Sequence, residues 1–181
     1  LQERGLDLDF AQLRLHWSRG FVAEQVRFGA SAATNNPALP RLTAREVEFN
    51  LHLRALLLAR VQVDSIAMRG GKLQWTLTPS NALARSLTIE NIETRLRLLS
   101  EDRWLLDDLR GRFGGADFFL SGSLTNASAI RDWQFAAAAG RWPERLRKLA
   151  DIMDRIAFST PPELRLDVNG DARDLGSFDA R

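Results

Sequence analysis

The chain contains no cysteine and no tyrosine, and only two of its 181 residues are lysines. The absence of cysteine excludes structural disulfides and thiolate metal sites. With no Tyr, no Cys and few lysines, almost nothing titrates between histidine and arginine. The sequence pI of about 9.9 therefore accompanies a formal net charge of only +2.

Charge of one sign is not concentrated over most of the sequence. Acidic residues stand beside the arginines, as in Arg45-Glu46 and in the segment Asp107 to Arg110. A nucleic-acid-binding protein should instead present a basic face that neutralises phosphates. We therefore expect no nucleic-acid partner.

Long apolar runs are also missing. A run as long as any, Ala55 to Ala59, falls far short of the ~20 residues of a membrane-spanning helix. No signal peptide is visible, and the chain opens with Leu1, so we expect a segment of a longer protein.

What the sequence does contain is one repeated pattern, apolar-x-apolar-x-x-apolar-x-apolar. Alternation with period two indicates a strand with one buried face. The extra residue in the middle reverses the alternation, and a strand accommodates it by a β-bulge, which bends the strand. Long strands that all bend alike predict a curved trough with an apolar inner wall. The pattern occupies residues 8–15, 21–28, 42–49, 61–68, 87–94 and 104–111.

Turn signals separate the expected strands. Glycine supplies positive φ in tight hairpins, which predicts turns at Ser18-Arg19-Gly20, Gly70-Gly71 and Gly114-Gly115 and antiparallel pairing between the strands they join. The strands are expected at about 6–17, 21–30, 42–53, 60–69, 72–77, 87–99, 104–113, 116–124 and 133–138, with boundaries good to ~2–4 residues.

A faint internal repeat supports stacking of similar β units. Residues 42–53 align with residues 87–98: both begin Leu-Thr, carry the extra residue at the same place and finish on alternating leucines. Each copy precedes a return strand and a Gly-Gly pair. Repeated units of this kind contact mainly their neighbours in an elongated stack.

One segment has helical rather than strand periodicity. Between Pro143 and Phe158, apolar residues fall at helical spacing with charges between them, and Pro161-Pro162 block continuation. This predicts an amphipathic helix near residues 143–158 that covers part of the trough. Its apolar stripe consists of Leu146, Leu149, Met153 and Ile156.

Chemistry-bearing constellations are weak throughout. His16 and His52 occupy polar positions of expected strands, and neither has a partner evident in the sequence. Asp107-Asp108 flank an expected bulge. Residues 169–171 lack the remaining ligands of a calcium loop, and residues 121–123 lie in a strand and form no nucleophile elbow. We expect no catalysis, no metal and no cofactor.

The strands together resemble the AsmA-like family of bacterial envelope proteins. The resemblance rests on VEFNLHLRALLLARVQV (residues 47–63), LRGRFGGADFFLSGSL (residues 109–124) and LDVNGDARDL (residues 166–175). It implies a repeating β-groove extended through the periplasm, in a parent protein anchored to the inner membrane by a helix that is absent here. It also implies a role in conducting phospholipids between the inner and outer membranes.

We accordingly expect a mainly β fold of long, bulged, antiparallel strands in a curved repeating groove. Residues 1–138 form the groove units, 139–160 contain the covering helix, and 161–181 begin a further, truncated β unit. The expected partners are phospholipid acyl chains and neighbouring β units of the same longer chain. The candidate groove residues are Val47, Phe49, Leu51, Leu53, Val61, Val63, Ile66, Met68, Leu73, Trp75, Ile92, Leu96, Leu98, Phe118 and Leu120.

Three alternatives remain open at this point. The apolar face could be the dry core of a sandwich in a structural or protein-binding β-module. The strands could close into a lipocalin-like cup. A membrane surface is a further candidate partner, because Arg145, Arg147 and Lys148 lie beside the apolar stripe of the expected helix.

Overall fold

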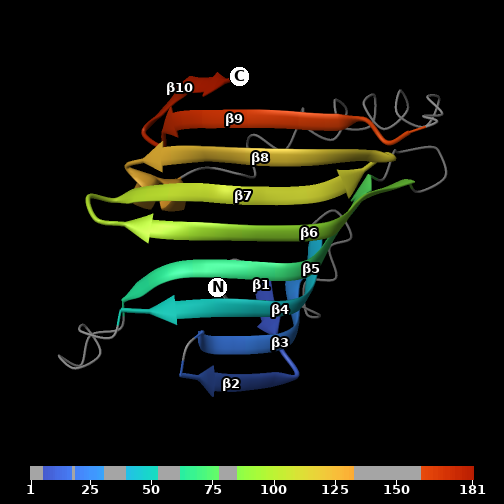
Figure 1. The fold of residues 1–181 in the computed structure, drawn as a ribbon, viewed down its shortest axis with the longest axis vertical. Helices are drawn as coiled ribbons and strands as arrows, with labels where there is room; N and C mark the ends of the chain where they lie inside the picture. Colours follow the sequence, from blue (N-terminus) through green and yellow to red (C-terminus); the bar gives the residue numbers. More distant parts are fainter. Residues whose placement is uncertain (1–5, 18, 31–39, 53–61, 78–84, 133–159) are drawn as a thin grey trace.

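The structure is a computed structural model that describes residues 6–17, 19–30, 40–52, 62–77, 85–132 and 160–181. Within these residues ten strands form one sheet (Figure 1). From β3 to β10, strands that are consecutive in the sequence are neighbours in the sheet. The strands are β1 (Leu6–Asp9), β2 (Gln12–His16), β3 (Gly20–Ala30), β4 (Arg41–Leu51), β5 (Val63–Leu77), β6 (Arg85–Leu99), β7 (Arg103–Phe113), β8 (Ala116–Thr125), β9 (Glu163–Asp171) and β10 (Asp174–Ala180). A short 3₁₀ helix, η2 (Ala127–Asp132), follows β8.

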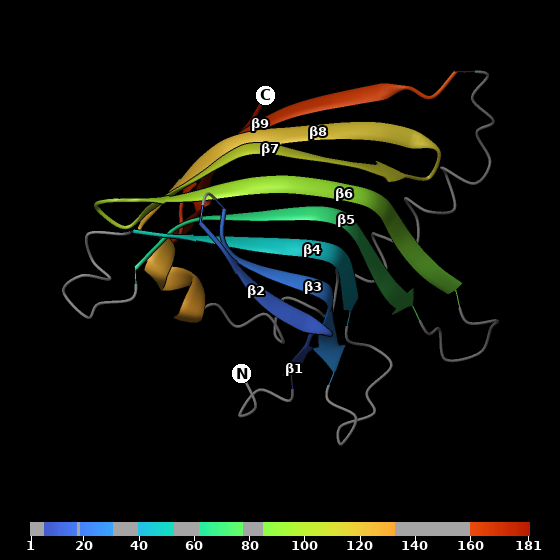
Figure 2. The ribbon, with the colours of Figure 1, turned by 60° about the horizontal axis from the view of Figure 1, so that its bottom comes forward.

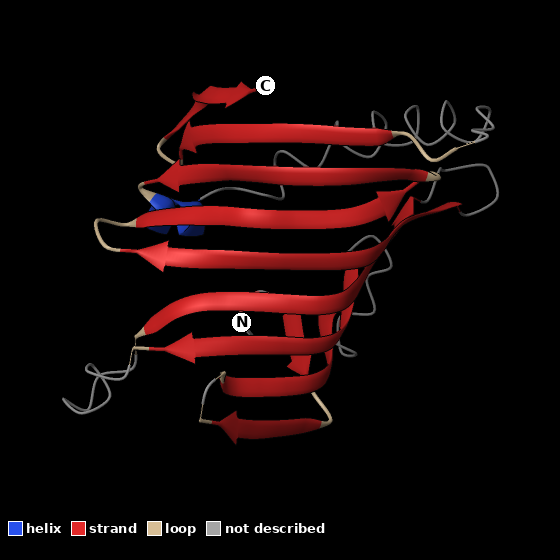
Figure 3. Ribbon diagram, viewed as in Figure 1, coloured by secondary structure: helices blue, strands red, loops and turns tan. Residues whose placement is uncertain are grey.

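The ten strands confirm the prediction of a mainly β fold. The sheet is open, so the described residues do not close into a cup. Its order is β1-β3-β4-β5-β6-β7-β8-β9-β10, and β2 pairs with β3 beside β1. Residues 163–171 and 174–180 belong to this same sheet. Figure 3 shows how the described strands run side by side across it, with η2 near one end of β7 and β8.

Antiparallel pairing was expected throughout, and one pair departs from it. β9 lies parallel to β8, with Asp117 opposite Glu163 and Thr125 opposite Asp171. A parallel neighbour needs a crossover of a dozen or more residues, and residues 126–162 separate these two strands. The sequence offers no tight turn there that would enforce an antiparallel return.

Irregularities occur at some of the predicted reversals: the register shifts between Met68 and Leu73 in the β5–β6 pair and between Glu90 and Glu93 in the β6–β7 pair. The β3–β4 pair keeps one register through the reversals in both of its strands. Gln25 and Asn91 take positive φ values of 52° and 53° at the reversals of alternation in β3 and β6. The register of β4 on β5 shifts between Asn50 and Leu51, and that of β7 on β8 shifts between Leu106 and Leu109. The edge strand expected at 6–17 is interrupted between Asp9 and Gln12, so it forms β1 and β2.

The hairpin predicted at Gly70-Gly71 is wrong. β5 runs through both glycines as one strand, which replaces the expected pair 60–69 and 72–77. Gly70 has φ 60° and lies beside Arg45, so its conformational freedom serves a mid-strand bulge rather than a turn. The Gly114-Gly115 turn is confirmed between β7 and β8, at φ 55° and 81°. A Gly-Gly turn therefore follows only one of the two repeat copies.

Three predictions lie outside the described residues. These are the amphipathic helix at 143–158 with Leu146, Leu149, Met153 and Ile156, the strand at 133–138, and the groove candidates Leu53 and Val61. Among the residues that the structure describes, no helix has the length and apolar character needed to cross a membrane.

The buried core of the described residues is small. No second sheet faces the first one there, and the buried apolar side chains are mostly alanine and valine. The large apolar side chains of the central strands keep part of their surface exposed instead. The buried apolar residues are Val22, Ala23, Val26, Ala44, Ala67, Leu87, Ile92, Ala127 and Ala172.

The sheet is strongly curved. Figure 2 shows it as an arch, with β4, β5 and β6 turning downward at one end and η2 beneath the other. Bulges bend strands and increase their twist, and register shifts occur within the adjacent pairs β5–β6, β6–β7 and β7–β8 of this sheet.

Candidate functional site

Apolar side chains form rows that cross the sheet from strand to strand. Residues directly opposite each other in paired strands project to the same face, so the register assigns each row to one side. The first row crosses eight strands and contains a single hydroxyl residue, Thr94. It consists of Leu13, Ala23, Val47, Met68, Thr94, Leu109, Leu120 and Leu166.

Two further rows run alongside the first. The second row consists of Leu15, Phe21, Phe49, Ile66, Leu96, Leu106, Gly122, Val168 and Ala180. The third row consists of Leu8, Phe28, Leu42, Leu73, Ile89, Phe113 and Ala116. We call the side of the sheet that carries these three rows the apolar face.

The opposite side, the charged face, is crossed by ion pairs between neighbouring strands. Lys72 reaches Glu90 at 2.9 Å, Arg97 reaches Asp107 at 2.6 Å, and Arg110 reaches Glu93 at 2.7 Å. Exposed pairs of this kind contribute little stability each. The charged side chains keep this face of the sheet hydrated, in contrast to the apolar face.

One ion network on the charged face is partly buried. Arg19, in the β2–β3 turn, contacts Glu46 and Glu48, and Arg69 lies 3.2 Å from Glu48. Glu48 is only 9% exposed, so its carboxylate depends on these two guanidinium groups. The network covers Val22 and ties the first hairpin to β4 and β5.

The reversals interrupt the alternation within single strands. At each reversal two consecutive residues fall outside the apolar rows, for example Glu90-Asn91 in β6 and Asp107-Asp108 in β7. The alternation then resumes on the same face, so the apolar rows continue on both sides of the reversal.

The central strands bring most of the sequence-derived groove candidates together. Val47, Met68 and Leu120 lie in the first row, Phe49, Ile66 and Leu96 in the second, and Leu73 in the third. Beside the rows, Leu51 pairs with Val63, Trp75 with Leu87, and Leu98 with Trp104.

The last two candidates pack against glycines. Ile92 is 6% exposed and lies against Gly71, whose missing Cβ would approach the Ile92 Cβ to 3.0 Å. The Phe118 ring covers Gly111 in the same way, with a Cβ there only 2.8 Å away. These two side chains therefore contribute more to packing within the sheet than to an open surface.

The groove candidates included no residue of β1, β2, β3, β7 or β9 and only part of the apolar residues of β4 and β6, although the same pattern was visible in these segments. The alternation in residues 8–15, 21–28 and 104–111 was clear enough to assign their apolar side chains to the same face. The residues missed are Leu8, Leu13, Leu15, Phe21, Ala23, Phe28, Leu42, Ile89, Leu106, Leu109, Phe113, Leu166 and Val168. They extend the apolar face to both edges of the sheet.

One histidine was assigned no partner and has one. His52 Nδ1 lies 3.0 Å from Asp64 Oδ2, where β4 ends beside the bulge in β5. The sequence could not anticipate this contact, because it depends on the β4–β5 register. His16 is exposed at the end of β2. In the part of the chain that the structure describes, no three His, Cys, Asp or Glu side chains form a metal-binding group.

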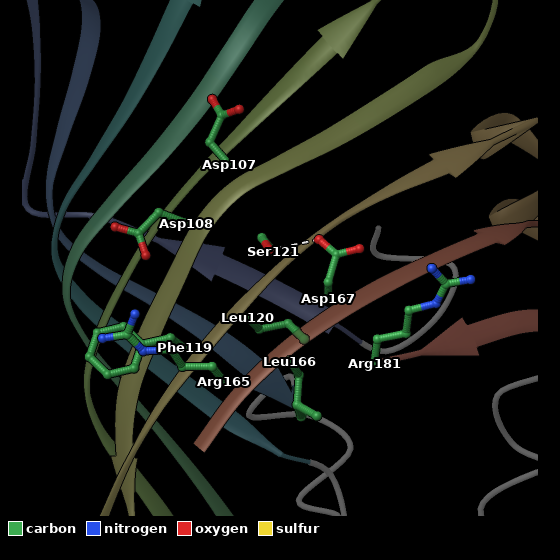
Figure 4. A pocket seen from close by; sticks show the side chains of 9 residues that line it. All are labelled: Asp107, Asp108, Phe119, Leu120, Ser121, Arg165, Leu166, Asp167 and Arg181. Carbon is green, nitrogen blue, oxygen red and sulfur yellow. Dashed lines mark hydrogen bonds between the residues drawn. The ribbon is translucent and has the colours of Figure 1, made fainter. Parts of the chain in front are cut away.

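A hollow of about 420 Å³ lies over β7, β8 and β9 (Figure 4). Arg165 stacks on Phe119 with 5.4 Å from its guanidinium carbon to the ring centroid, and Ser121 donates a 2.9 Å hydrogen bond to Asp167. Asp107 and Asp108 also line it, with Leu120, Leu166 and Arg181. Side chains of both charges line the hollow, so it selects no ligand of one sign.

Two carboxyl groups at strand ends have lowered pKa values. The side-chain hydrogen bond from Arg112 lowers the pKa of Asp117 below its usual value, at the β7–β8 hairpin. Hydrogen bonds from the Arg173 backbone N–H and the Asn126 side chain lower the pKa of Asp171 beside η2. Both carboxylates stabilise connections of the sheet rather than a reactive centre.

No protein-family model, curated protein or solved structure matches this chain.

Proposed function

We propose that the apolar face binds lipid acyl chains and lets them move along the row direction, without catalysis. The observation that carries this proposal is the continuity of the rows. The first row runs from β2 to β9, and the second row runs from β2 to β10, from one edge of the described sheet to the other. A closed pocket for one ligand would instead be bounded by side chains at its ends.

The dimensions of the apolar face suit acyl chains. Seven strand spacings of about 4.8 Å give the first row a length of roughly 34 Å. One acyl chain spans about half of the ~30 Å hydrocarbon core of a bilayer, or roughly 15 Å. About two chains therefore fit end to end along one row, and the three rows offer parallel tracks.

The exposure of the row residues supports the same proposal. Leu166 is 36% exposed and Leu13 is 49% exposed, and the row residues between them include Met68, Leu109 and Leu120, which are half-buried. Each methylene removed from water contributes about 0.8 kcal/mol. An acyl chain that covers these side chains gains from its own burial and from theirs.

The sequence resemblance to AsmA-like proteins suggests where this protein acts and which lipids it carries. A segment of an AsmA-like envelope protein would act in the periplasm, in a parent protein anchored to the inner membrane. It would take phospholipids as cargo, have neighbouring β units of the same chain as partners, and serve outer-membrane biogenesis. The balanced charges of the charged face disfavour nucleic acid, and they leave the apolar face as the binding surface.

The decisive experiment measures bound lipid. The protein is purified from a bacterial host without detergent, and its lipid content is determined by native mass spectrometry and organic extraction. We expect co-purified phospholipid in stoichiometric amounts. A lipid-free protein that takes up no fluorescent fatty acid would overturn the proposal and favour a structural or protein-binding β-module.

A matched pair of variants locates the lipid. Leu73→Glu puts a charge into the third row, whereas Gln74→Glu puts the same charge on the adjacent, exposed position of the charged face. We expect Leu73→Glu to lose most of its bound lipid and Gln74→Glu to keep it. Equal lipid content in the two variants would show that lipid does not lie on the apolar face.

A further inference from the structure

The first edge of the sheet has an open backbone ladder. Ala11 donates to the Glu24 carbonyl at 3.0 Å, which places the backbone groups of Gln12, Arg14 and His16 toward β3. The alternation turns the N–H and C=O of Leu13 and Leu15 outward, where no described strand pairs with them. Their side chains are 49% and 64% exposed. This edge therefore offers both hydrogen bonds and apolar contact.

The opposite edge has the same alternation. Asp167 and Arg181 exchange two backbone hydrogen bonds of 2.9 and 3.0 Å, and Asn169 pairs with Asp179. The intervening residue, Ala180, therefore turns its N–H and C=O away from β9. Ala180 lies in the second row, on the apolar face. Phe178 is 38% exposed, and its ring lies over Gly170.

The two edges complement each other in direction, hydrogen bonding and side chains. β2 runs opposite to β10, so the two edges meet as antiparallel strands when two molecules are placed side by side. If Leu13 faces Ala180, Arg14 faces Asp179 and Leu15 faces Phe178, apolar side chains meet on one face and opposite charges on the other. Moving the register by two residues in one direction would set Arg14 against Arg181, which is unfavourable.

We propose that a second copy of this chain pairs its β2 edge with the β10 edge of the first, in this register. The contact is heterologous, so further copies can add at both free edges and the assembly is open-ended. The sheet becomes continuous across the junction, and the first row of one copy continues into the second row of the next. Charged residues and prolines on edge strands hinder such pairing. The positions whose backbone groups point outward are instead apolar here: Leu13 and Leu15 on β2 and Ala180 on β10.

A mixing experiment tests the proposal independently of any lipid. Leu15→Lys blocks the β2 edge and Ala180→Lys blocks the β10 edge, and both positions are exposed, so folding should survive. We expect the unaltered chain to show mass that increases with concentration in sedimentation velocity. Each variant alone should be monomeric. Their equimolar mixture should form a one-to-one dimer, because each variant retains one functional edge.

Other results would overturn the proposal. A monodisperse unaltered chain at every concentration would do so, and so would an Ala180→Lys variant that still dimerises, which indicates pairing of β2 with itself. Trp17→Ser serves as the control, since Trp17 is 99% exposed but lies beyond β2. Loss of association in that variant would indicate general adhesion of an apolar side chain. Circular dichroism verifies that each variant remains folded.

Discussion

Replacement of Leu96 by aspartate separates an open apolar face from a dry core. Leu96 lies in the second row between Ile66 and Leu106 and is half-buried. Full burial of a leucine side chain contributes about 1.5–3 kcal/mol, so the loss of a half-buried one costs roughly 1 kcal/mol. The new carboxylate can remain hydrated on an open face, which adds little to that cost. We expect Leu96→Asp to stay folded with a slightly lower melting temperature.

Ile92 is the matched position in the same strand. Its side chain is 6% exposed against Gly71, so Ile92→Asp places an unpaired carboxylate among apolar neighbours. Such a group costs several kcal/mol, a large share of the total stability of a domain. We expect Ile92→Asp to unfold the sheet or to lower its melting temperature far more than Leu96→Asp does.

Circular dichroism melts, read together with lipid content, decide between the two environments. Leu96→Asp should keep its fold and lose lipid, and Leu51→Asp should behave alike, since Leu51 is half-buried at the end of β4 beside Val63. If both variants unfold as completely as Ile92→Asp, the second row is a sealed core. The proposed lipid-binding face would then be abandoned.

Two further predictions concern the connections of the sheet. Gly122→Ala should separate β8 from β9, because a Cβ at this position would lie 1.8 Å from the Val168 carbonyl oxygen. Gly115→Ala is the control, since nothing lies within 4 Å of its Cβ, and it should cost only the ~1–2 kcal/mol of a left-handed residue. Chemical denaturation measures the free energy of unfolding of both variants. Arg112→Ala should raise the pKa of Asp117 back toward 3.8, as an NMR titration of the carboxyl group would show. Because the folded-state pKa is lowered, the contribution of Asp117 to stability is present above about pH 3.8 and is lost as the pH falls below it; an unchanged pKa in the variant would contradict the assigned cause.

Local alternation was sufficient to predict most of the described strands and the reversals at which β3 and β6 take positive φ. The extra residue at Gln25 and at Asn91 is visible as a reversal of the apolar pattern, and a backbone that keeps its apolar side on one face has few ways to absorb it. The same reasoning located the two faces of β4 and β6. These features depend on residues within a few positions of one another, which is the range over which a sequence pattern is informative.

The errors arose where the pattern alone does not determine pairing. Gly70-Gly71 has the composition of a hairpin turn, yet Gly70 supplies the positive φ of a bulge, because Met68 and Leu73 continue the ladders on both sides of it. A Gly-Gly pair meets either need, and only the register of the neighbouring strands distinguishes them. The parallel pairing of β9 with β8 likewise follows from a long connection that carries no turn signal.

The candidate site could also be predicted only in part, because some of its features depend on single strands and others on the pairing between strands. Single strands revealed which side chains are apolar, but the rows exist only across strands, where Val47 meets Met68 and Leu109 meets Leu120. The His52–Asp64 contact also depends on that register. Side chains at the edges, such as Leu13 and Leu166, become prominent only when the strand order places them there.

The small buried core of the described sheet and the exposed apolar side chains at its edges have a common physical consequence. A monomeric domain normally buries its large apolar side chains and blunts its edge strands, since both features otherwise promote association. Here Leu13 and Leu15 combine the two features at one edge, and Leu164 and Leu166, 53% and 36% exposed, do so near the other. Lipid on the apolar face and a second copy of the chain at the edges would satisfy different needs of the same sheet. The first removes side-chain surface from water, and the second pairs the backbone, so each proposal can fail while the other stands.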